Sequence, residues 1–491
     1  MEDDVLQRLE KIYLATREEF QKIPLDLLER SGVYKNRNGW SMSYPSTVFL
    51  DGFDDPGRVV IPDVISNLYV SLPFCSRQCT FCTIISGVDN RRREEYFKAL
   101  FAEMEFYKRQ KRPKVRYIDL GGGSVSFLTP EELDSLMCKI EECFELPENP
   151  EVCLEAHPEL ARQGNRHDLL RVARKHKIPN ISFGVQTFDD ALLERLNRGH
   201  TVGDVKESAR IAKQFLPSFS IDLLGGIEGQ TKESLFTTLA ETIRLKPGSI
   251  DFYTYINSHN SIESSADNAN SLFTVLFVLN SLVSFGWFPH RLCSDVVIFK
   301  RPDENDNIND VIRGLGPFGK LEMIGLGSGA FSFSSRFHSA NPYDIPKYIS
   351  NVKENGLGFS LYSENSAEAY FCNFVKDSIR RYCRLNFNTV RKIFGIDFRR
   401  EYSTVIERLA SLGLIKMGPS GNGFRLTKLG FIYDDKVISF FFPAKYFEDY
   451  FALEEKVNSS HLKEFHEEIC NSPFNFELTP EIHSFIRKQR S

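Results

Sequence analysis

The stretch Tyr69-Val-Ser-Leu-Pro-Phe-Cys75-Ser-Arg-Gln-Cys79-Thr-Phe-Cys82 joins an apolar run to three cysteines. The run from Leu68 to Leu72 predicts a buried strand, so the cysteines fall in the loop that follows it. Three close thiolates can hold a soft metal ion or an iron–sulfur cluster. A closed zinc site needs four ligands, and no second paired motif accompanies this one. We therefore expect a cubane cluster with one open iron; packed cysteines, or zinc with a distant fourth ligand, remain alternatives.

Short apolar runs alternate with helical patterns on both sides of this loop. Strand–helix alternation at roughly forty-residue spacing predicts an α/β fold with a parallel sheet or partial (β/α)6 barrel over residues 61–350. The expected strands are Leu68–Leu72, Arg116–Leu120, Val152–Ala156, Asn180–Val185, Ser218–Leu224 and Ile250–Ile256, and the expected helices between them include Glu94–Tyr107, Pro130–Phe144, Asp168–His176 and Thr231–Leu245.

The flanking segments have different patterns. Residues 1–60 are interpreted as an N-terminal extension with a helix over Val5–Ile23. In residues 361–491, Phe387–Phe394 and Tyr402–Leu412 predict two helices, and Leu414–Leu426 predicts a β-ribbon, which together resemble a winged-helix cap. The cap lacks a basic recognition helix, so we expect no nucleic-acid partner.

The composition is that of an ordinary globular chain. It has 491 residues, and 61 basic against 66 acidic side chains give a net charge of −5. The acidic N-terminus has no basic segment followed by an apolar core, so we expect no signal peptide and a cytoplasmic, reducing environment. The uncharged stretch Ser271–Phe288 is diluted by polar residues and is interpreted as a buried helix rather than a membrane span. Seven of the ten cysteines are interpreted as reduced packing residues.

Motifs along the chain resemble the radical S-adenosylmethionine (SAM) superfamily. More narrowly, they resemble the branch that contains oxygen-independent coproporphyrinogen III oxidase, haem chaperones, and two-SAM C-methylases and cyclopropanases. After the cysteine loop, six motifs follow in family order: Gly121-Gly-Gly-Ser124, Glu155-Ala-His-Pro158, Gly184-Val-Gln-Thr-Phe188, Asn197-Arg-Gly-His-Thr201, Asp222-Leu-Leu-Gly-Gly226 and Gly325-Leu-Gly-Ser-Gly-Ala-Phe331.

The resemblance implies a set of site residues. The cluster ligands would be Cys75, Cys79 and Cys82. The first SAM would be bound by Tyr69, Gly122, Glu155 and Phe331. A second SAM would be bound by Phe81, Gly123, Ser124, Gln186, Arg198, Asp222 and Ile256, among which Arg198 can pair with a carboxylate. No catalytic residue is assigned, because Tyr253, Tyr255 and Asp295 are too common in structural roles.

The resemblance also implies the activity. The [4Fe-4S] cluster would cleave SAM reductively to a 5′-deoxyadenosyl radical, and the first hypothesis is that a second SAM donates a methyl or methylene carbon to an unsaturated carbon of a small molecule. The alternatives are oxidative decarboxylation like that of coproporphyrinogen III oxidase, and a haem chaperone. We expect a monomer that receives electrons from a reduced flavodoxin or ferredoxin.

Departures from the branch weigh against decarboxylation. Thr83 and Ile84 follow the loop where the oxidase has a fourth cysteine, and Ser71 stands in place of a histidine. His338 is interpreted as a surface histidine, with haem ligation left open.

Overall fold

A single mixed sheet organises the molecule. The computed structural model describes residues 2–25, 50–82, 91–255, 268–293, 296–301 and 322–443. Six parallel strands pair in chain order: β2 (Val64–Leu72), β3 (Lys114–Gly122), β4 (Glu151–Ala156), β5 (Asn180–Gln186), β6 (Ser218–Gly225) and β7 (Ser249–Thr254). These are the six predicted strands, and the α/β fold class with a parallel sheet is confirmed. Within the described residues the six parallel strands form no closed barrel: β2 and β7 do not pair with each other, and each pairs on its outer side with a further strand.

The sheet extends beyond the six strands on each side. Next to β2 lie parallel β10 (Met323–Leu326) and then antiparallel β11 (Phe331–Phe333), β12 (Phe337–Ala340), β13 (Leu361–Glu364) and β1 (Asp51–Gly52). Next to β7 lie antiparallel β9 (Val296–Lys300) and β8 (Phe288–Cys293). The sheet thus runs past both ends of residues 61–350, and the division of the chain into three units stays a prediction.

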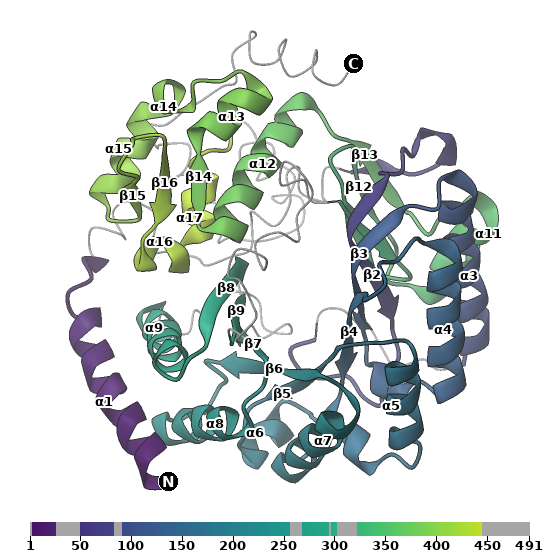
Figure 1. Ribbon diagram of the computed structural model, residues 1–491, viewed down its shortest axis with the longest axis horizontal. Coiled ribbons are helices and arrows are strands. Elements are labelled where there is room, and N and C mark those ends of the chain that lie inside the picture. The colour runs from purple at the N-terminus through teal and green to yellow at the C-terminus, as the bar shows by residue number, and fades with distance from the viewer. Residues whose placement is uncertain are drawn as a thin grey trace.

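Helices cover the outer face of the parallel strands. Figure 1 shows α3 (Arg93–Gln110), α4 (Pro130–Cys143), α5 (Arg166–Lys175), α7 (Val202–Phe215) and α8 (Lys232–Leu245) arranged around the curved sheet. Capping boxes at Thr129, Thr201 and Thr231 satisfy free N–H groups where three of these helices begin. Because side chains alternate along a strand, Leu68, Leu120 and similar residues are buried under the helices, and the intervening polar residues point to the other face.

The N-terminal helix α1 (Glu2–Phe20) packs against α9 (Asn268–Ser284). Tyr13 makes edge contacts with Phe273 and Phe277 of α9, and Arg8 donates a hydrogen bond to the Ser284 hydroxyl over 2.9 Å. Leu276 and most other apolar side chains of α9 are buried, which confirms a buried helix, but the helix ends at Ser284 and Phe288 lies exposed in β8. Within the described ranges, none of the helices has both the length and the apolar character that a bilayer crossing requires.

The C-terminal module sits beside β8 in Figure 1. Its elements are α12 (Ala367–Tyr382), β14 (Arg384–Asn386), α13 (Phe387–Phe394), α14 (Phe398–Glu401), α15 (Ser403–Ser411), β15 (Ile415–Met417), β16 (Gly423–Leu426), α16 (Lys428–Ile432) and α17 (Asp434–Ser439). The two predicted helices and the ribbon are present, and β14 adds a third strand. A buried ion pair between Arg380 and Asp434 joins the first and last helices over 3.2 Å.

Candidate functional site

The cysteine loop begins where β2 ends. Cys79 is buried, and Cys75 and Cys82 are partly exposed. Burial and the neighbouring thiols of Cys82 and Cys79 raise the pKa of Cys75 to about 12, so a positively charged ligand is needed to hold Cys75 as a thiolate.

The spacing of these sulfur atoms bears on what they can hold. Two sulfurs bound to one zinc ion at about 2.3 Å lie no more than about 4.6 Å apart. Among the described residues, the three cysteines are not a group whose ligand atoms all lie within 4.8 Å of one another. Their arrangement therefore suits a multinuclear cluster better than a single ion.

Residues in or next to two later motifs hold the loop. Asn197 donates to the carbonyl of Gln78 over 2.7 Å, and the N–H of Thr80 donates to the carbonyl of Leu196 over 3.2 Å. From the other side, the Ser76 hydroxyl donates to a carboxylate oxygen of Glu159 over 2.8 Å. The loop is thus fixed by the segments that follow β4 and α6 (Asp190–Arg195).

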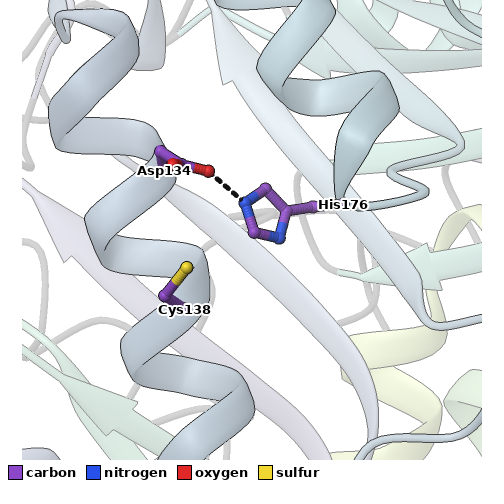
Figure 2. A group of neighbouring side chains, drawn as sticks. All are labelled: Asp134, Cys138 and His176. Atoms are coloured by element: carbon purple, nitrogen blue, oxygen red, sulfur yellow. Dashed lines mark hydrogen bonds and ion pairs between the residues drawn. The ribbon is translucent and has the colours of Figure 1, made fainter.

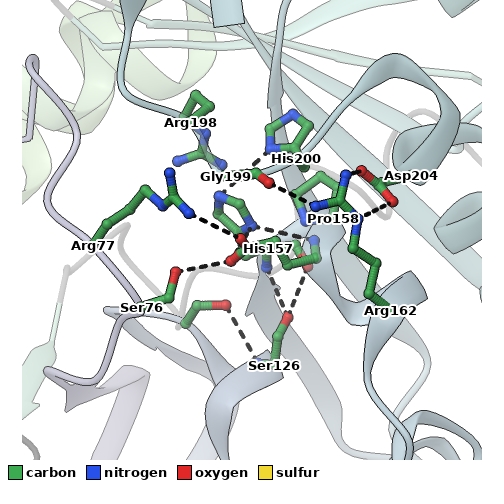
Figure 3. Close-up of polar contacts among 12 residues, drawn as sticks. Ser76, Arg77, Ser126, His157, Pro158, Arg162, Arg198, Gly199, His200 and Asp204 are labelled. Carbon is green, nitrogen blue, oxygen red and sulfur yellow. Dashed lines mark hydrogen bonds and ion pairs between the residues drawn. The ribbon is translucent and has the colours of Figure 1, made fainter. Parts of the chain in front are cut away.

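A buried pair of histidines lies between those two segments (Figure 3). The N–H of Glu159 donates to Nδ1 of His157, whose Nε2 lies 3.5 Å from Nδ1 of His200. Nε2 of His200 lies 3.2 Å from the carbonyl of Val185. With the proton on Nε2 in both rings, His157 donates to His200 and His200 donates to Val185, so every contact in the series is a hydrogen bond. Burial, reinforced by Arg198, lowers the pKa of both histidines, that of His200 to about 3. The pair is therefore neutral and serves as a rigid support; both residues lie in quoted motifs, yet the sequence analysis gave them no role.

Three consecutive glycines form the edge of the site at the end of β3. A Cβ on Gly121 would lie 2.1 Å from Oε2 of Glu155, and a Cβ on Gly123 would lie 2.5 Å from the carbonyl oxygen of Leu72. Gly122 has a φ of +91°, and its N–H lies 3.4 Å from the same carboxylate oxygen. Because these glycines have no side chains, the Glu155 carboxylate can lie against the backbone of β3. This contact brings together Gly122 and Glu155, both of which were predicted to bind the first SAM.

The inner face of the parallel strands is acidic. Burial, with Asp119 and Asp251 nearby, raises the pKa of Glu155 to about 8. Burial and the charges of Asp251 and Glu155 also raise the pKa of Asp222 well above its usual range, although Ser182 donates to it over 3.0 Å. Asp119 and Asp251 were missed by the sequence analysis, although alternation along β3 and β7 places them on this face.

Arg198 is the cation that reaches the cysteine loop. Its Nη1 lies 3.2 Å from Sγ of Cys79, and its Nη2 donates to the carbonyl of Gly184 over 2.5 Å. Its Nε is buried and has no hydrogen-bond partner among the described residues. A buried guanidinium with an unused N–H is suited to an anionic ligand group such as a carboxylate.

Gln186 occupies a strained position at the end of β5. Its φ of +69° lies in the left-handed region, which a residue with a side chain rarely adopts. The register of β5 against β6 shifts at this point, and a Cβ on Gly184 would lie 3.0 Å from Nε2 of Gln186. The strain directs the amide toward Gly184 and Arg198, and such positions are common in binding sites.

The other predicted binding residues lie around this centre. Tyr69 is half-buried on β2 near Glu155, and Ser124 caps the turn after the glycines. Phe81 packs with Tyr253 and Tyr255 on a small apolar cluster formed by Leu192, Leu196, Leu224 and Ile227. Ile256, Asp295, Thr83 and Ile84 lie outside the described residues.

The late glycine motif is anchored by a residue that the sequence analysis missed. Glu103, fully buried on α3, accepts hydrogen bonds from the N–H groups of Gly327 (3.0 Å) and Gly358 (2.8 Å) and from the hydroxyl of Tyr348 (2.7 Å). These bonds hold the turn that leads to Phe331, whose ring lies 6.4 Å from that of Tyr343.

Two expectations from the sequence are wrong. His338 is no surface residue: it is 2% exposed, and its ring lies 5.3 Å from that of Phe333 because β12 turns it into the sheet. Cys138 is not a packing residue, because it lies on the exposed side of α4.

Comparisons with known proteins show which proteins the chain resembles. Residues 69–241 match the radical SAM superfamily. The oxygen-independent coproporphyrinogen III oxidase of Pseudomonas aeruginosa is 24% identical over 377 residues, which are 72% of this chain and 81% of that protein. The haem chaperone HemW of Bacillus subtilis is 22% identical over 364 residues, which are 72% of this chain and 93% of the chaperone.

The fold of a solved relative is also shared. The structure of Escherichia coli coproporphyrinogen III oxidase (HemN), described in its title as a radical SAM enzyme, superposes with a TM-score of 0.69 at 20% identity. The superposition covers 81% of this chain and 95% of that one. Radical SAM proteins use a [4Fe-4S] cluster and SAM, and the thiolates, the glycine edge and Arg198 fit those groups. Residues 69–241 therefore match the radical SAM superfamily, and most of the chain is similar in sequence to oxygen-independent coproporphyrinogen III oxidases and HemW haem chaperones and shares the fold of the Escherichia coli oxidase.

Proposed function

We propose that this protein is a radical SAM enzyme that abstracts hydrogen from a small molecule bound inside the curved sheet, in the manner of oxygen-independent coproporphyrinogen III oxidase. The observation that carries the proposal is the convergence of Cys79, Arg198 and Glu155 at the carboxyl ends of neighbouring parallel strands. In open α/β sheets and barrels, ligands bind at this end of the strands.

Cys75, Cys79 and Cys82 would hold the cluster. When bound, the cluster supplies the electron that cleaves SAM to methionine and a 5′-deoxyadenosyl radical. The chain's own residues position the groups: Glu155 is placed to accept from an amino group next to Gly122, and Tyr69 and Phe331 line the same edge. We expect a reduced flavodoxin or ferredoxin to supply the electron, and we expect the protein to act as a monomer.

A second SAM beside the first is part of the proposal. Arg198 would pair with its carboxylate through the unused Nε, since the other two nitrogens already have partners. Gln186 and Asp222 flank Arg198 at the ends of β5 and β6. Phe81, Gly123 and Ser124 would complete this second subsite.

For the reaction type, we favour the activity of the relatives over methyl transfer from a second SAM, which was our first hypothesis. The long sequence matches are to coproporphyrinogen III oxidases and haem chaperones, which favours decarboxylation over the methyl transfer that the sequence analysis placed first. The acidic inner face restricts how such a substrate can bind: the carboxyl groups of Asp119, Asp222 and Asp251 offer no cationic partner to a substrate carboxylate. The carboxylates of a tetrapyrrole must therefore face the mouth of the sheet.

An anaerobic assay tests the proposal. The reconstituted protein is incubated with SAM, a reductant and coproporphyrinogen III, and 5′-deoxyadenosine, carbon dioxide and S-adenosylhomocysteine are measured. We expect deoxyadenosine and carbon dioxide without S-adenosylhomocysteine, and no turnover after Cys75→Ala, Cys79→Ala or Cys82→Ala. The matched control is Cys138→Ser, an exposed cysteine outside the site.

Each other outcome overturns a definite part of the proposal. S-adenosylhomocysteine with a methylated product would restore methyl transfer. Haem transfer that persists without SAM cleavage would identify a chaperone. A normal cluster in the cysteine variants would contradict the site itself.

A further inference from the structure

A second group of metal-ligating side chains lies on the outer helical layer. Asp134 and Cys138 are one turn apart on α4, and His176 is the residue at which α5 ends. One carboxylate oxygen, the thiol sulfur and a ring nitrogen all lie within 4.8 Å of one another. Figure 2 shows Asp134 and Cys138 projecting from α4 toward the ring of His176. The arrangement is independent of the radical SAM site and of the function proposed for it.

The histidine ring is oriented as it is in metal sites. Its Nδ1 lies 2.7 Å from Oε1 of Glu141, and its Nε2 lies 2.6 Å from Oδ1 of Asp134. The His176 side chain is only 4% exposed, so packing fixes the ring plane. Metal-binding histidines usually donate the N–H that faces away from the metal to a carboxylate, and Glu141 is placed to accept it. Nε2 hydrogen-bonds to Asp134 in this structure, and a metal ion would take the place of the proton in that contact.

The donor set selects the ion. We propose that Asp134, Cys138 and His176 bind a zinc ion, with a fourth position open to water. A thiolate with an imidazole suits zinc and disfavours magnesium or calcium, which take oxygen ligands. Cys138 is exposed, so an ion can reach it from solvent. Bound zinc would join α4 to α5.

Neighbouring charges are compatible with an ion. The ammonium of Lys175 lies 2.6 and 2.8 Å from the two carboxylate oxygens of Asp134, and this contact with that of His176 lowers the pKa of the carboxyl. Asp134 could keep Lys175 on one oxygen and offer the other to the ion, because the Lys175 side chain is largely exposed to solvent. Cys138 would give up its proton on binding the ion, so that Asp134, Glu141 and the thiolate would together outweigh the charge of Lys175.

A similar group nearby does not meet these conditions. Glu105, Glu142 and Cys143 also lie within 4.8 Å of one another. However, Lys139 bonds both carboxylates, and burial raises the pKa of the Cys143 thiol to about 11. That group has no imidazole, so its geometry is explained by ion pairs alone.

Thiol protection tests the zinc site in the intact protein. Holoprotein with its iron–sulfur cluster is alkylated anaerobically in buffers of fixed free zinc, and the Cys138 peptide is followed by mass spectrometry. Once free zinc exceeds the dissociation constant about tenfold, we expect alkylation of Cys138 to slow by about tenfold, because only the unbound thiol reacts. The protection should disappear in His176→Gln and in Asp134→Asn.

The matched control is Asp168→Asn, which removes an exposed ion pair between Asp168 and Arg171 of α5. Zinc should still protect Cys138 from alkylation in this variant. Zinc content should fall by one ion per chain in Cys138→Ser. Equal alkylation rates with and without micromolar zinc would overturn the proposal. Protection of Cys138 that survives in both His176→Gln and Asp134→Asn would also overturn it. In either case His176 would serve only as an ionic link between two carboxylates.

Discussion

Replacement of Gly121 by alanine isolates the contact between the glycine edge and Glu155. The φ of Gly121 is not in the left-handed region, so alanine is compatible with the backbone. Its Cβ, however, would lie 2.1 Å from Oε2 and 2.3 Å from Cδ of Glu155. The carboxylate must therefore move, while the cysteine loop keeps all of its own contacts.

The magnitude follows from what the displaced carboxylate would bind. A hydrogen bond between ionised groups contributes about 1.5 to 3 kcal/mol. Its loss corresponds to about 10- to 150-fold weaker SAM binding, at 1.4 kcal/mol for each factor of ten. Glu155→Gln should weaken binding similarly. Because both changes act through the same carboxylate, the double variant should bind SAM no more weakly than the weaker single variant.

The assay is equilibrium binding of SAM to the anaerobically reconstituted protein above pH 8, where Glu155 is ionised. Iron and sulfide contents should equal those of the wild type. The control is Gly164→Ala, because a Cβ there meets nothing within 4 Å. Wild-type affinity for SAM in Gly121→Ala would refute the placement of the first SAM, and so would additive losses in the double variant.

Four further predictions concern pH, the second subsite and stability. The pKa of Glu155 lies near 8 instead of its ordinary 4.5, so the ratio of SAM affinities between wild type and Glu155→Gln should rise with pH up to about 8 and then level off. Because the pKa of Glu155 is raised from 4.5 to about 8 in the folded protein, the SAM-free protein should lose stability as pH rises between these values and the carboxyl gives up its proton. The unfolding midpoint should therefore fall over this pH range, and Glu155→Gln should not show this fall. Arg198→Lys should reduce SAM binding from two equivalents to one in equilibrium dialysis, whereas Arg195→Lys, at an exposed site on α6, should retain both. Glu103→Ala should destabilise the protein by about 3 kcal/mol, seen as a lower denaturation midpoint, because it leaves two N–H groups and a hydroxyl buried without an acceptor.

The parallel sheet could be predicted because its signals are local. Each strand from β2 to β7 is a short apolar run bounded by turn residues, and each run was identified from its own residues. The short strands β10 to β13 were not predicted, since three or four residues carry too little pattern. The third strand of the C-terminal sheet, β14, was missed for the same reason.

The binding residues were found through motifs, and the supporting residues were not. Glu155, Arg198 and Gln186 lie in recognisable motifs and converge in the structure. Glu103 and Asp251 lie in ordinary helix and strand sequence, where an acidic residue usually faces solvent. Only packing shows that Glu103 is buried and that Asp251 lies near Glu155.

The amino-acid sequence by itself determined the parallel α/β architecture and the cysteine loop, because periodicity and cysteine spacing are properties of neighbouring residues. Tertiary structure alone decided which groups meet across the sheet: Arg198 with Cys79, Glu155 with the Gly122 backbone, and His176 with Asp134. Tertiary structure also turned His338 inward and left Cys138 exposed. The physical reason is that burial and hydrogen bonding depend on residues far away in the chain, which only the folded arrangement brings within contact distance.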